Sequence, residues 1–447
     1  MKLYLLVWQV QNSELFDDMY NNQALLDFIE SSPSPFHAVS SMSSRLLESG
    51  FTQIFEEATW SLSPGKYFVT RNGSSIVAFI VGTDEITDSG FRMIGAHTDS
   101  PCLKVKPNPE VIRDQYLSLA VEVYGGALLN PWFDRDLSLA GRVSFENENG
   151  QVSSRLINFK RPIGTIPSLA IHLDREANNV RSINPQKDIP PLLLINNHDD
   201  SKLGIDEILK SQIEAEYSET SVKNILAHEL SFFDTQSPAL LGINEEFIAS
   251  ARLDNLLSCY IGLSALLNAG DKVSTLLVCN DHEEVGSTSA EGAQGPFLKS
   301  ILERLIPDNE TRYRSISKSM MISADNAHGI HPNFPDKHDA NHGPLLNKGP
   351  VIKINANQRY ATNSETTAYF KFLCEKVNVP SQSFVVRSDM ACGSTIGPLT
   401  AKEIGIRTLD IGVPTFGMHS IRELAGSKDT GYLLTALSAF YNDTESI

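Results

Sequence analysis

Two adjacent carboxylates, Glu283 and Glu284, follow two residues after the apolar run VSTLLVCN at residues 273–280. Adjacent acidic residues are typical of a solvated surface, and Glu-Glu occurs at two other places in this chain. At the end of a buried strand, however, neighbouring side chains point in different directions. One carboxylate can then bind a metal ion while the other accepts a proton from water, as metal-dependent hydrolysis requires. This interpretation requires further ligands elsewhere in the chain.

Four further residues of metal-binding types lie where predicted strands end or a predicted helix begins. They are His97 after FRMIGA, Asp254 before NLLSCYIGL, Asp325 after SMMISA and His419 after RTLDIGVPTFGM. Ligands of open α/β sheets bind beyond the carboxyl ends of the strands, so we expect these side chains at one edge of a sheet. Two histidines, terminal carboxylates and a bridging carboxylate are sufficient for a dinuclear site with a shared water, holding zinc, cobalt or manganese.

Each of these residues alone has an ordinary explanation. The motif H-x-D, found at His97–Asp99, occurs three times in the chain and is a weak signal by itself. Asp254 is also a residue type that caps helices. Aspartate is common in turns, so Asp325 is compatible with a turn, and His419 is equally compatible with an ordinary loop. The joint placement of these residues at strand ends is what favours a metal site.

Composition and charge exclude several other classes of protein. With 447 residues, 41% of them hydrophobic and 20% charged, the chain is typical of a globular protein of two or three domains. Its formal net charge of −17 argues against nucleic acid or an anionic membrane surface as a partner. The chain contains neither a G-x-x-x-x-G-K-[ST] phosphate loop nor a G-x-S-x-G nucleophile elbow. A nucleotide site and a serine nucleophile are therefore disfavoured.

Cysteine usage and the start of the chain indicate the compartment. Five cysteines are scattered without a C-x-x-C pair, which is typical of a reducing environment. No apolar stretch approaches the roughly 20 residues of a membrane helix. The initial MKLYLLVW lacks a small-residue cleavage site and is weak as a signal peptide. We expect a cytoplasmic protein in which residues 1–21 form an N-terminal extension.

The pattern of apolar residues changes twice along the chain. In residues 22–102 and 246–447, helical and strand-like runs alternate, which predicts an α/β fold with a mostly parallel sheet and helices on both faces. In residues 103–245, short runs alternate apolar and polar residues between Gly, Asn and Pro, which predicts an inserted β-rich domain. We expect SFVVRSD to form a strand and ACGSTIGP to form backbone turns.

Taken together, these motifs resemble the aspartyl aminopeptidase family, in its bacterial form, a branch of the dinuclear zinc metallopeptidases. The matching stretches are SPSPFHAV, GAHTDSPCLKVKP, NPWFDRDLSLAGRV, SLAIHLDRE, ARLDN, DHEEVGS, SADNAHGIHPN, NQRYATN, CGSTIGP and MHSIREL. They extend from about residue 22 to about residue 440. The resemblance implies an aminopeptidase that hydrolyses the N-terminal residue, Asp or Glu, from peptides.

The resemblance also implies a role for each candidate residue. The implied ligands of two zinc ions per subunit are His97, Asp254 as the bridge, Glu284, Asp325 and His419. Glu283 is implied to be the general base that takes a proton from a bridging, metal-bound water and returns it to the leaving amine. Asp99 is implied to be the carboxylate that orients His97.

One implied residue, His172, lies in the β-rich insertion. The family resemblance implies that this histidine reaches the active site of a neighbouring subunit and stabilises the oxyanion there. Residues 103–245 would then form a dimerisation domain, and dimers would build a tetrahedral dodecamer. An acidic substrate side chain requires a cation in the pocket, for which Lys353 and Arg359 are the candidates.

Three alternatives remain open from the sequence. The enzyme could prefer neutral, leucine-like residues, or it could be a related metal-dependent deacylase or carboxypeptidase. A non-enzymatic assembly protein with the same fold is the third alternative. No expected ligand is replaced in this chain, which argues against that last alternative.

Overall fold

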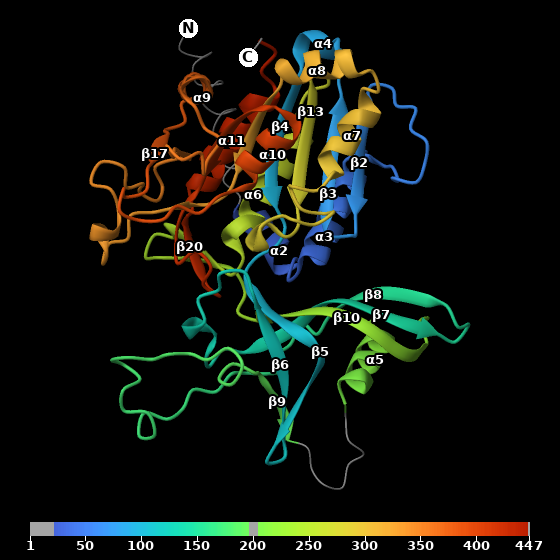
Figure 1. Cartoon of the computed structure of the whole chain (residues 1–447), viewed down its shortest axis with the longest axis vertical. Helices are drawn as coiled ribbons and strands as arrows, with labels where there is room; N and C mark the ends of the chain where they lie inside the picture. The colour runs from blue at the N-terminus through green and yellow to red at the C-terminus, as the bar shows by residue number, and fades with distance from the viewer. Residues whose placement is uncertain (1–21, 196–203, 446–447) are drawn as a thin grey trace, which may run out of the picture.

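The structure is a computed structural model that describes residues 22–195 and 204–445. The predicted N-terminal extension, residues 1–21, lies outside the described residues. Figure 1 shows two parts. In one part helices flank a large sheet, and the other part consists mainly of long strands. Within the described residues, no helix is long and apolar enough to cross a membrane.

The larger part is built on a nine-stranded sheet. In spatial order its strands are β1 (Thr52–Gln53), β2 (Gly65–Arg71), β3 (Ser75–Val81), β13 (Ser274–Asn280), β4 (Phe91–His97), β14 (Met320–Ala324), β18 (Arg407–Gly412), β16 (Val351–Lys353) and β17 (Gln382–Phe384). Five of the eight pairings between these described strands are parallel, and three are antiparallel. The central strands β13, β4, β14 and β18 run parallel, so their carboxyl ends share one edge.

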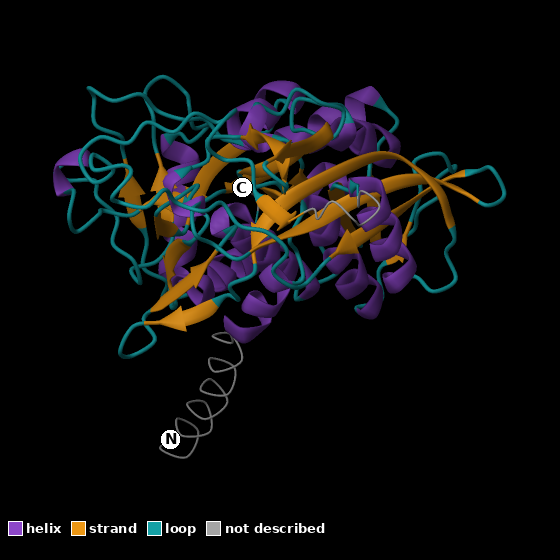
Figure 2. Cartoon of the chain, turned by 90° about the horizontal axis from the view of Figure 1, so that it is seen from below, coloured by secondary structure: helices purple, strands orange, loops and turns teal. Residues whose placement is uncertain are grey.

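Side-chain alternation along the strands explains why helices cover both faces of this sheet. In β13, Leu277 and Cys279 belong to one buried cluster, whereas Leu276 and Val278 belong to another. The first cluster is covered by α2 (Asn22–Glu30), α3 (Pro35–Glu48), α6 (Leu253–Leu267), α9 (Ser364–Lys376) and α11 (Asp429–Tyr441). The second is covered by α4 (Ile86–Ser89), α7 (Phe297–Leu305), α8 (Asn309–Ser317) and α10 (Ile396–Ile404). Figure 2 shows helices on both sides of the strands, which confirms the predicted fold class.

Three elements differ from the sequence-based expectation. ACGSTIGP was expected to form turns, but its second half begins α10, whose Gly397 packs against the Asp410 carboxylate. Helix α8 was missed because its sequence, NETRYRSIS, has almost no apolar periodicity. Its start is fixed instead by Asp308, which accepts a hydrogen bond from the amide of Thr311. The expected strand SFVVRSD is short, since β17 ends at Phe384.

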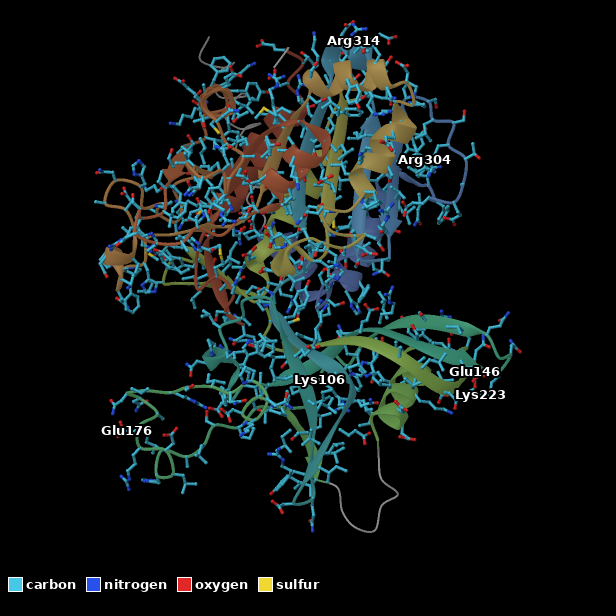
Figure 3. All side chains as sticks on the ribbon, in the orientation of Figure 1. Lys106, Glu146, Glu176, Lys223, Arg304 and Arg314 are labelled. Carbon is cyan, nitrogen blue, oxygen red and sulfur yellow. The ribbon has the colours of Figure 1, made fainter. Side chains whose placement is uncertain are left out.

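The second part contains a six-stranded sheet in which all described pairings are antiparallel. Its strands in order are β8 (Val152–Asn158), β7 (Leu137–Asn147), β10 (Val222–Asp234), β5 (Cys102–Arg113), β6 (Tyr116–Tyr124) and β9 (Leu192–Ile195). Helix α5 (Ile205–Glu216) buries Leu209 and Ile213 in the cluster beneath this sheet. An ion pair of 2.7 Å between Glu146 and Lys223 links β7 to β10 near the tip of the part (Figure 3). The predicted bounds of the inserted domain, residues 103–245, and its role in dimerisation stay predictions.

A third, five-stranded sheet lies beside the large one. It is formed by β11 (Ala239–Leu241), β12 (Phe247–Ser250), β20 (Glu423–Gly426), β19 (Pro414–Phe416) and β15 (Ala327–His328). Strands β12 and β20 pair antiparallel, with Ser250 opposite Glu423. This pairing brings the start of α6 next to the chain that follows β19.

The start of α3 contains a partly buried histidine, His37, whose titration affects stability. Ser34 caps the helix, and its Oγ lies 2.8 Å from His37 Nδ1. Burial, assisted by the positive charges of Arg252 and Lys160, lowers the pKa of His37 from 6.5 to about 4. Between these pH values the unfolded chain binds more protons than the folded chain. The contribution of His37 to the free energy of unfolding is therefore fully present above pH 6.5 and is lost as the pH falls toward 4.

We therefore expect His37→Gln to have a shallower loss of stability between pH 6.5 and 4 than the unsubstituted protein. Urea-unfolding midpoints across this range would measure the two slopes, and the values at pH 8 would give the cost of the substitution itself. Identical slopes for both proteins would contradict the assigned pKa.

Candidate active site

The predicted ligands meet at the shared edge of the large sheet. His97 is the last residue of β4, and Asp325 follows β14 directly. Glu283 and Glu284 lie in the short 3-10 helix η2 (Glu283–Val285) after β13. These three strands are neighbours in the sheet and run parallel, which is why residues more than 200 positions apart meet.

His97 is at the centre of the first group of ligands. Its side chain is 1% exposed, and its Nε2 lies 3.4 Å from Asp254 Oδ1 and 3.6 Å from Asp325 Oδ1. Glu283 Oε2 is 3.9 Å from the same nitrogen. One histidine nitrogen thus faces three carboxylates.

A second group forms around His419. Its Nε2 lies 3.3 Å from Glu284 Oε2 and 3.5 Å from Asp254 Oδ2. Asp254 therefore faces His97 with one oxygen and His419 with the other. This is the arrangement required of a carboxylate that bridges two cations.

The donor atoms fit divalent cations in spacing and in chemistry. Two ligands at about 2.0–2.1 Å from a tetrahedral zinc ion lie roughly 3.3–3.4 Å apart, close to the separations of the two groups. Asp254 Oδ1 and Glu284 Oε1 are buried and have no hydrogen-bond partner. Burial of unpaired carboxylate oxygens is costly unless a cation compensates them. The sets His97–Asp254–Asp325 and Asp254–Glu284–His419 are each compact enough to hold one ion.

The electrostatics of the two glutamates also point to a cation. Burial, opposed in part by His97 and reinforced by neighbouring carboxylates, raises the pKa of Glu283 to about 8. Burial and the negative charge of Asp254 raise the pKa of Glu284 to about 11. A divalent cation between these groups would favour their ionised forms and reverse this trend. The cluster is therefore an unfavourable arrangement for the protein alone and a favourable one for the protein with bound metal.

Asp99 fixes the turn that carries the two glutamates. Its Oδ1 accepts a hydrogen bond from the Glu283 amide, and its Oδ2 accepts one from the Glu284 amide, both at 3.1 Å. The Tyr124 hydroxyl donates to Oδ2 at 2.7 Å. His97 Nδ1 is 3.1 Å from the Asp99 carbonyl oxygen and 3.4 Å from its carboxylate. The carboxylate is thus well placed for the orienting role predicted for it, and it holds the glutamate backbone as well.

The smaller part of the protein also reaches this site. In the turn after β6, the Gly126 carbonyl accepts a hydrogen bond of 3.2 Å from His419 Nδ1, which directs Nε2 toward the carboxylates. The amide of Leu128 donates to the His419 carbonyl at 3.0 Å. Gly125 has a φ of +68°, and a Cβ there would lie 3.1 Å from Glu284 Cβ. The close approach of this turn therefore requires glycine.

A cavity of about 470 Å³ opens onto the cluster, and both predicted substrate-binding residues line it. Lys353 is only 2% exposed, so it is not a strand-edge surface charge. Its Nζ donates to Asp325 Oδ2 at 3.2 Å and to the Asn326 carbonyl at 3.0 Å. Arg359 lies in the exposed part of the cavity wall. The role of either residue in substrate binding stays a prediction.

His172 lies apart from the cluster in this chain. It is exposed and is not among the described residues that line the cavity. Its neighbours Leu169, Ile171 and Leu173 are also exposed, at 57%, 47% and 75%. Figure 3 labels Glu176 in the same segment, on the smaller part of the molecule and away from the large sheet. The action of His172 on a neighbouring subunit stays a prediction.

Sequence reasoning missed three residues that support the site, namely Tyr124, Gly126 and Glu423. Tyr124 ends an alternating strand, where an aromatic residue is ordinary. Gly126 belongs to a Gly-Gly pair that resembles any turn. Glu423 stands four positions after the predicted ligand His419 in MHSIREL, and this short spacing is the sequence signal that could have indicated a supporting role.

Comparison with known proteins identifies the family. The profile of the family described as "Aminopeptidase I zinc metalloprotease (M18)" matches residues 28–441. A protein of Ectopseudomonas mendocina (strain ymp), named "Probable M18 family aminopeptidase 2", is 57% identical over 430 residues, covering 95% of this chain and 98% of that protein.

Solved structures agree with this assignment. The chain in the "Cryo-EM structure of the Ape4 and Nbr1 complex" is 40% identical with a TM-score of 0.91, covering 96% of this chain and 86% of that one. The chain in the "Structure of S. cerevesiae mApe1 dodecamer" is 28% identical with a TM-score of 0.81, covering 96% and 97%. The chain belongs to the M18 family of zinc metalloproteases and is an aminopeptidase.

Proposed function

We propose that this aminopeptidase removes N-terminal Asp or Glu residues from peptides by means of two zinc ions per subunit. The observation that carries the proposal is the position of Asp254 between two ligand groups, with one oxygen toward His97 and the other toward His419. His97 and Asp325 would hold one ion, Glu284 and His419 the other, and Asp254 would bridge them. Zinc, when bound, lowers the pKa of a water molecule and polarises the substrate carbonyl.

Glu283 is the general base in this proposal. It lies in the cavity wall beside both groups, and its side chain is 14% exposed, so it can contact a substrate. Its carboxylate would accept a proton from the attacking water and donate it to the leaving amine. Asp99 holds the Glu283 amide and thereby sets the direction of this side chain.

The preference for acidic residues rests on the two cations in the cavity wall. Lys353 is already bound to Asp325, whereas Arg359 is exposed in the cavity and free to turn toward a substrate carboxylate. A guanidinium–carboxylate pair is the strong, directional kind of hydrogen-bonded contact. In this proposal Arg359 makes the main contact and Lys353 adds positive charge at the base of the pocket.

We expect Arg359→Gln to lower kcat/KM for an Asp substrate by about 10- to 100-fold, since a hydrogen bond to a charged group contributes roughly 1.5–3 kcal/mol. Hydrolysis of a Leu substrate should change by less than about threefold, because it uses no such contact. Steady-state kinetics with both substrates would measure the difference. An equal loss on Asp and Leu substrates would instead assign Arg359 a general structural role.

The proposed assembly is a tetrahedral dodecamer built from dimers, located in the cytoplasm. The similar S. cerevesiae protein is described as a dodecamer. Residues 103–245 would form the contacts between dimer partners, and the exposed segment around His172 would complete the partner's site. Two features support this arrangement: the apolar exposure of Leu169, Ile171 and Leu173, and the distance of His172 from the cavity in its own chain.

Hydrolysis of a panel of substrates tests the proposal. Peptides that begin with Asp, Glu, Leu, Lys, Ala or N-acetyl-Asp would be incubated with the protein, with and without a chelator and with added zinc or cobalt. Metal-dependent cleavage of the Asp and Glu peptides, blocked by acetylation, is the expected result. Faster cleavage of Leu would overturn the acidic preference, and cleavage of the acetylated peptide would indicate a deacylase or another peptidase type.

A further inference from the structure

Glu423 connects two of the predicted metal ligands through their backbones. It is the first residue of β20 and is 2% exposed. Its Oε2 accepts a hydrogen bond of 2.9 Å from the amide of Asp254, and its Oε1 accepts one of 2.8 Å from the amide of His419. Both carboxylate oxygens are thus used to hold residues that come from different elements.

Through these two bonds, Glu423 links Asp254 and His419, which are far apart along the chain. Asp254 lies at the start of α6, and His419 lies in the turn between β19 and β20. The antiparallel pairing of β12 with β20 brings the two segments together, and Glu423 lies opposite Ser250 in that pairing. Because both hydrogen bonds end on one carboxyl group, Glu423 limits how far the backbones of Asp254 and His419 can separate.

We propose that Glu423 is a positioning residue that sets the affinity of the second cation subsite, which is formed by Asp254, Glu284 and His419. This inference rests on the proposed binding of two zinc ions. The second subsite depends on Glu423 for two of its three ligands. The first subsite shares Asp254, but the large sheet itself positions its other two ligands, because His97 is the last residue of β4 and Asp325 follows β14 directly.

Replacement of Glu423 by glutamine preserves size but changes the hydrogen bonding. The amide side chain offers one oxygen acceptor, and its NH₂ group would face the second backbone N–H. One of the two bonds is therefore lost, and a buried donor is left unpaired. Substitutions of groups that position metal ligands weaken metal binding by about 10- to 100-fold.

Asp429 provides a matched control. It is also fully buried, and its two oxygens accept hydrogen bonds from the amides of Asn347 and Gly349 at 2.6 and 2.8 Å. Neither Asp429 nor these partners line the active-site cavity. Asp429→Asn therefore imposes the same chemical change on a buried carboxylate without touching a metal ligand.

The test measures zinc per subunit in the assembled protein after equilibration with buffers of graded free zinc. We expect two ions in the unsubstituted protein and in D429N with the same affinities. In E423Q, we expect the ion of the second subsite to bind at least about 10-fold more weakly, with a smaller change at the first subsite, which shares only Asp254 with it. The substitution thus separates the two subsites without measuring activity.

Other outcomes distinguish failure of this inference from failure of the proposed two-zinc site. Two ions of unchanged affinity in E423Q would overturn this inference and leave the proposed function intact. Equal weakening in D429N would also overturn it, because it would assign the effect to loss of general stability. Fewer than two ions in the unsubstituted protein would overturn the dinuclear proposal and this inference with it. If E423Q is not recovered folded, Glu423→Asp, which keeps the carboxyl group but is one methylene shorter, is expected to show the same selective weakening, and unchanged affinities in it would overturn the inference.

Discussion

Glu283→Gln is expected to lower kcat by about 10²- to 10⁴-fold, which is the usual contribution of a positioned general base. The amide cannot accept the proton of the attacking water, although it fills the same space. The backbone amide of residue 283 is still available to Asp99, so the turn that carries Glu284 stays in place. Steady-state kinetics on an Asp peptide would measure the loss.

Zinc content and assembly are the controls for this variant. Because Glu284 and the other ligands are unchanged, we expect both ions to bind and the oligomer to keep its size. A near-normal rate in Glu283→Gln would show that another group moves the proton. Loss of a zinc ion would instead assign Glu283 as a metal ligand beside His97, whose Nε2 lies 3.9 Å from Glu283 Oε2.

His172→Phe is expected to lower kcat by about 10²- to 10³-fold, the loss seen when one oxyanion-stabilising donor is removed. The phenyl ring retains the bulk of the imidazole but cannot donate a hydrogen bond. Because His172 is exposed and outside the cavity of its own chain, zinc content should be unchanged. Loss of metal in this variant would contradict the predicted position of His172 in the partner's site.

Mixed assemblies test whether His172 acts across subunits. Glu283→Gln and His172→Phe chains, each nearly inactive alone, would be co-expressed with different affinity tags and purified together. A site with Glu283 from one chain and His172 from its partner is then complete, so random pairing should restore about a quarter of normal activity. Mixed oligomers that remain inactive would show that His172 acts in its own chain, and a His172→Phe chain that is active alone would show that it has no catalytic role.

The sequence was most informative where the signal was local. Apolar runs identified the central strands of the large sheet, and the polar residues at their ends identified His97, Asp325 and the Glu283–Glu284 pair. The convergence of these residues followed from one general rule about strand ends in α/β folds. The roles assigned to them, by contrast, came from the resemblance to a family and are still predictions.

What the sequence could not reveal depends on contacts between distant segments. Nothing near Glu423 indicates that its carboxylate bonds the amide of Asp254, because that bond exists only once β12 pairs with β20. In the same way, helix α10 is hidden in a glycine-containing stretch, since Gly397 is needed for its contact with Asp410. Local patterns identify elements and ligands, but the residues that hold ligands in place are specified by tertiary pairing.

The turn at Gly125–Gly126 has a thermodynamic consequence. This turn follows a strand of the smaller part, yet Gly126 fixes the His419 ring and Leu128 holds its carbonyl. Any cation that binds His419 more tightly in this docked arrangement must favour docking of the two parts by the same free energy, because coupling between two equilibria is reciprocal. Contacts of another subunit with the smaller part would therefore be coupled to the metal centre through this turn.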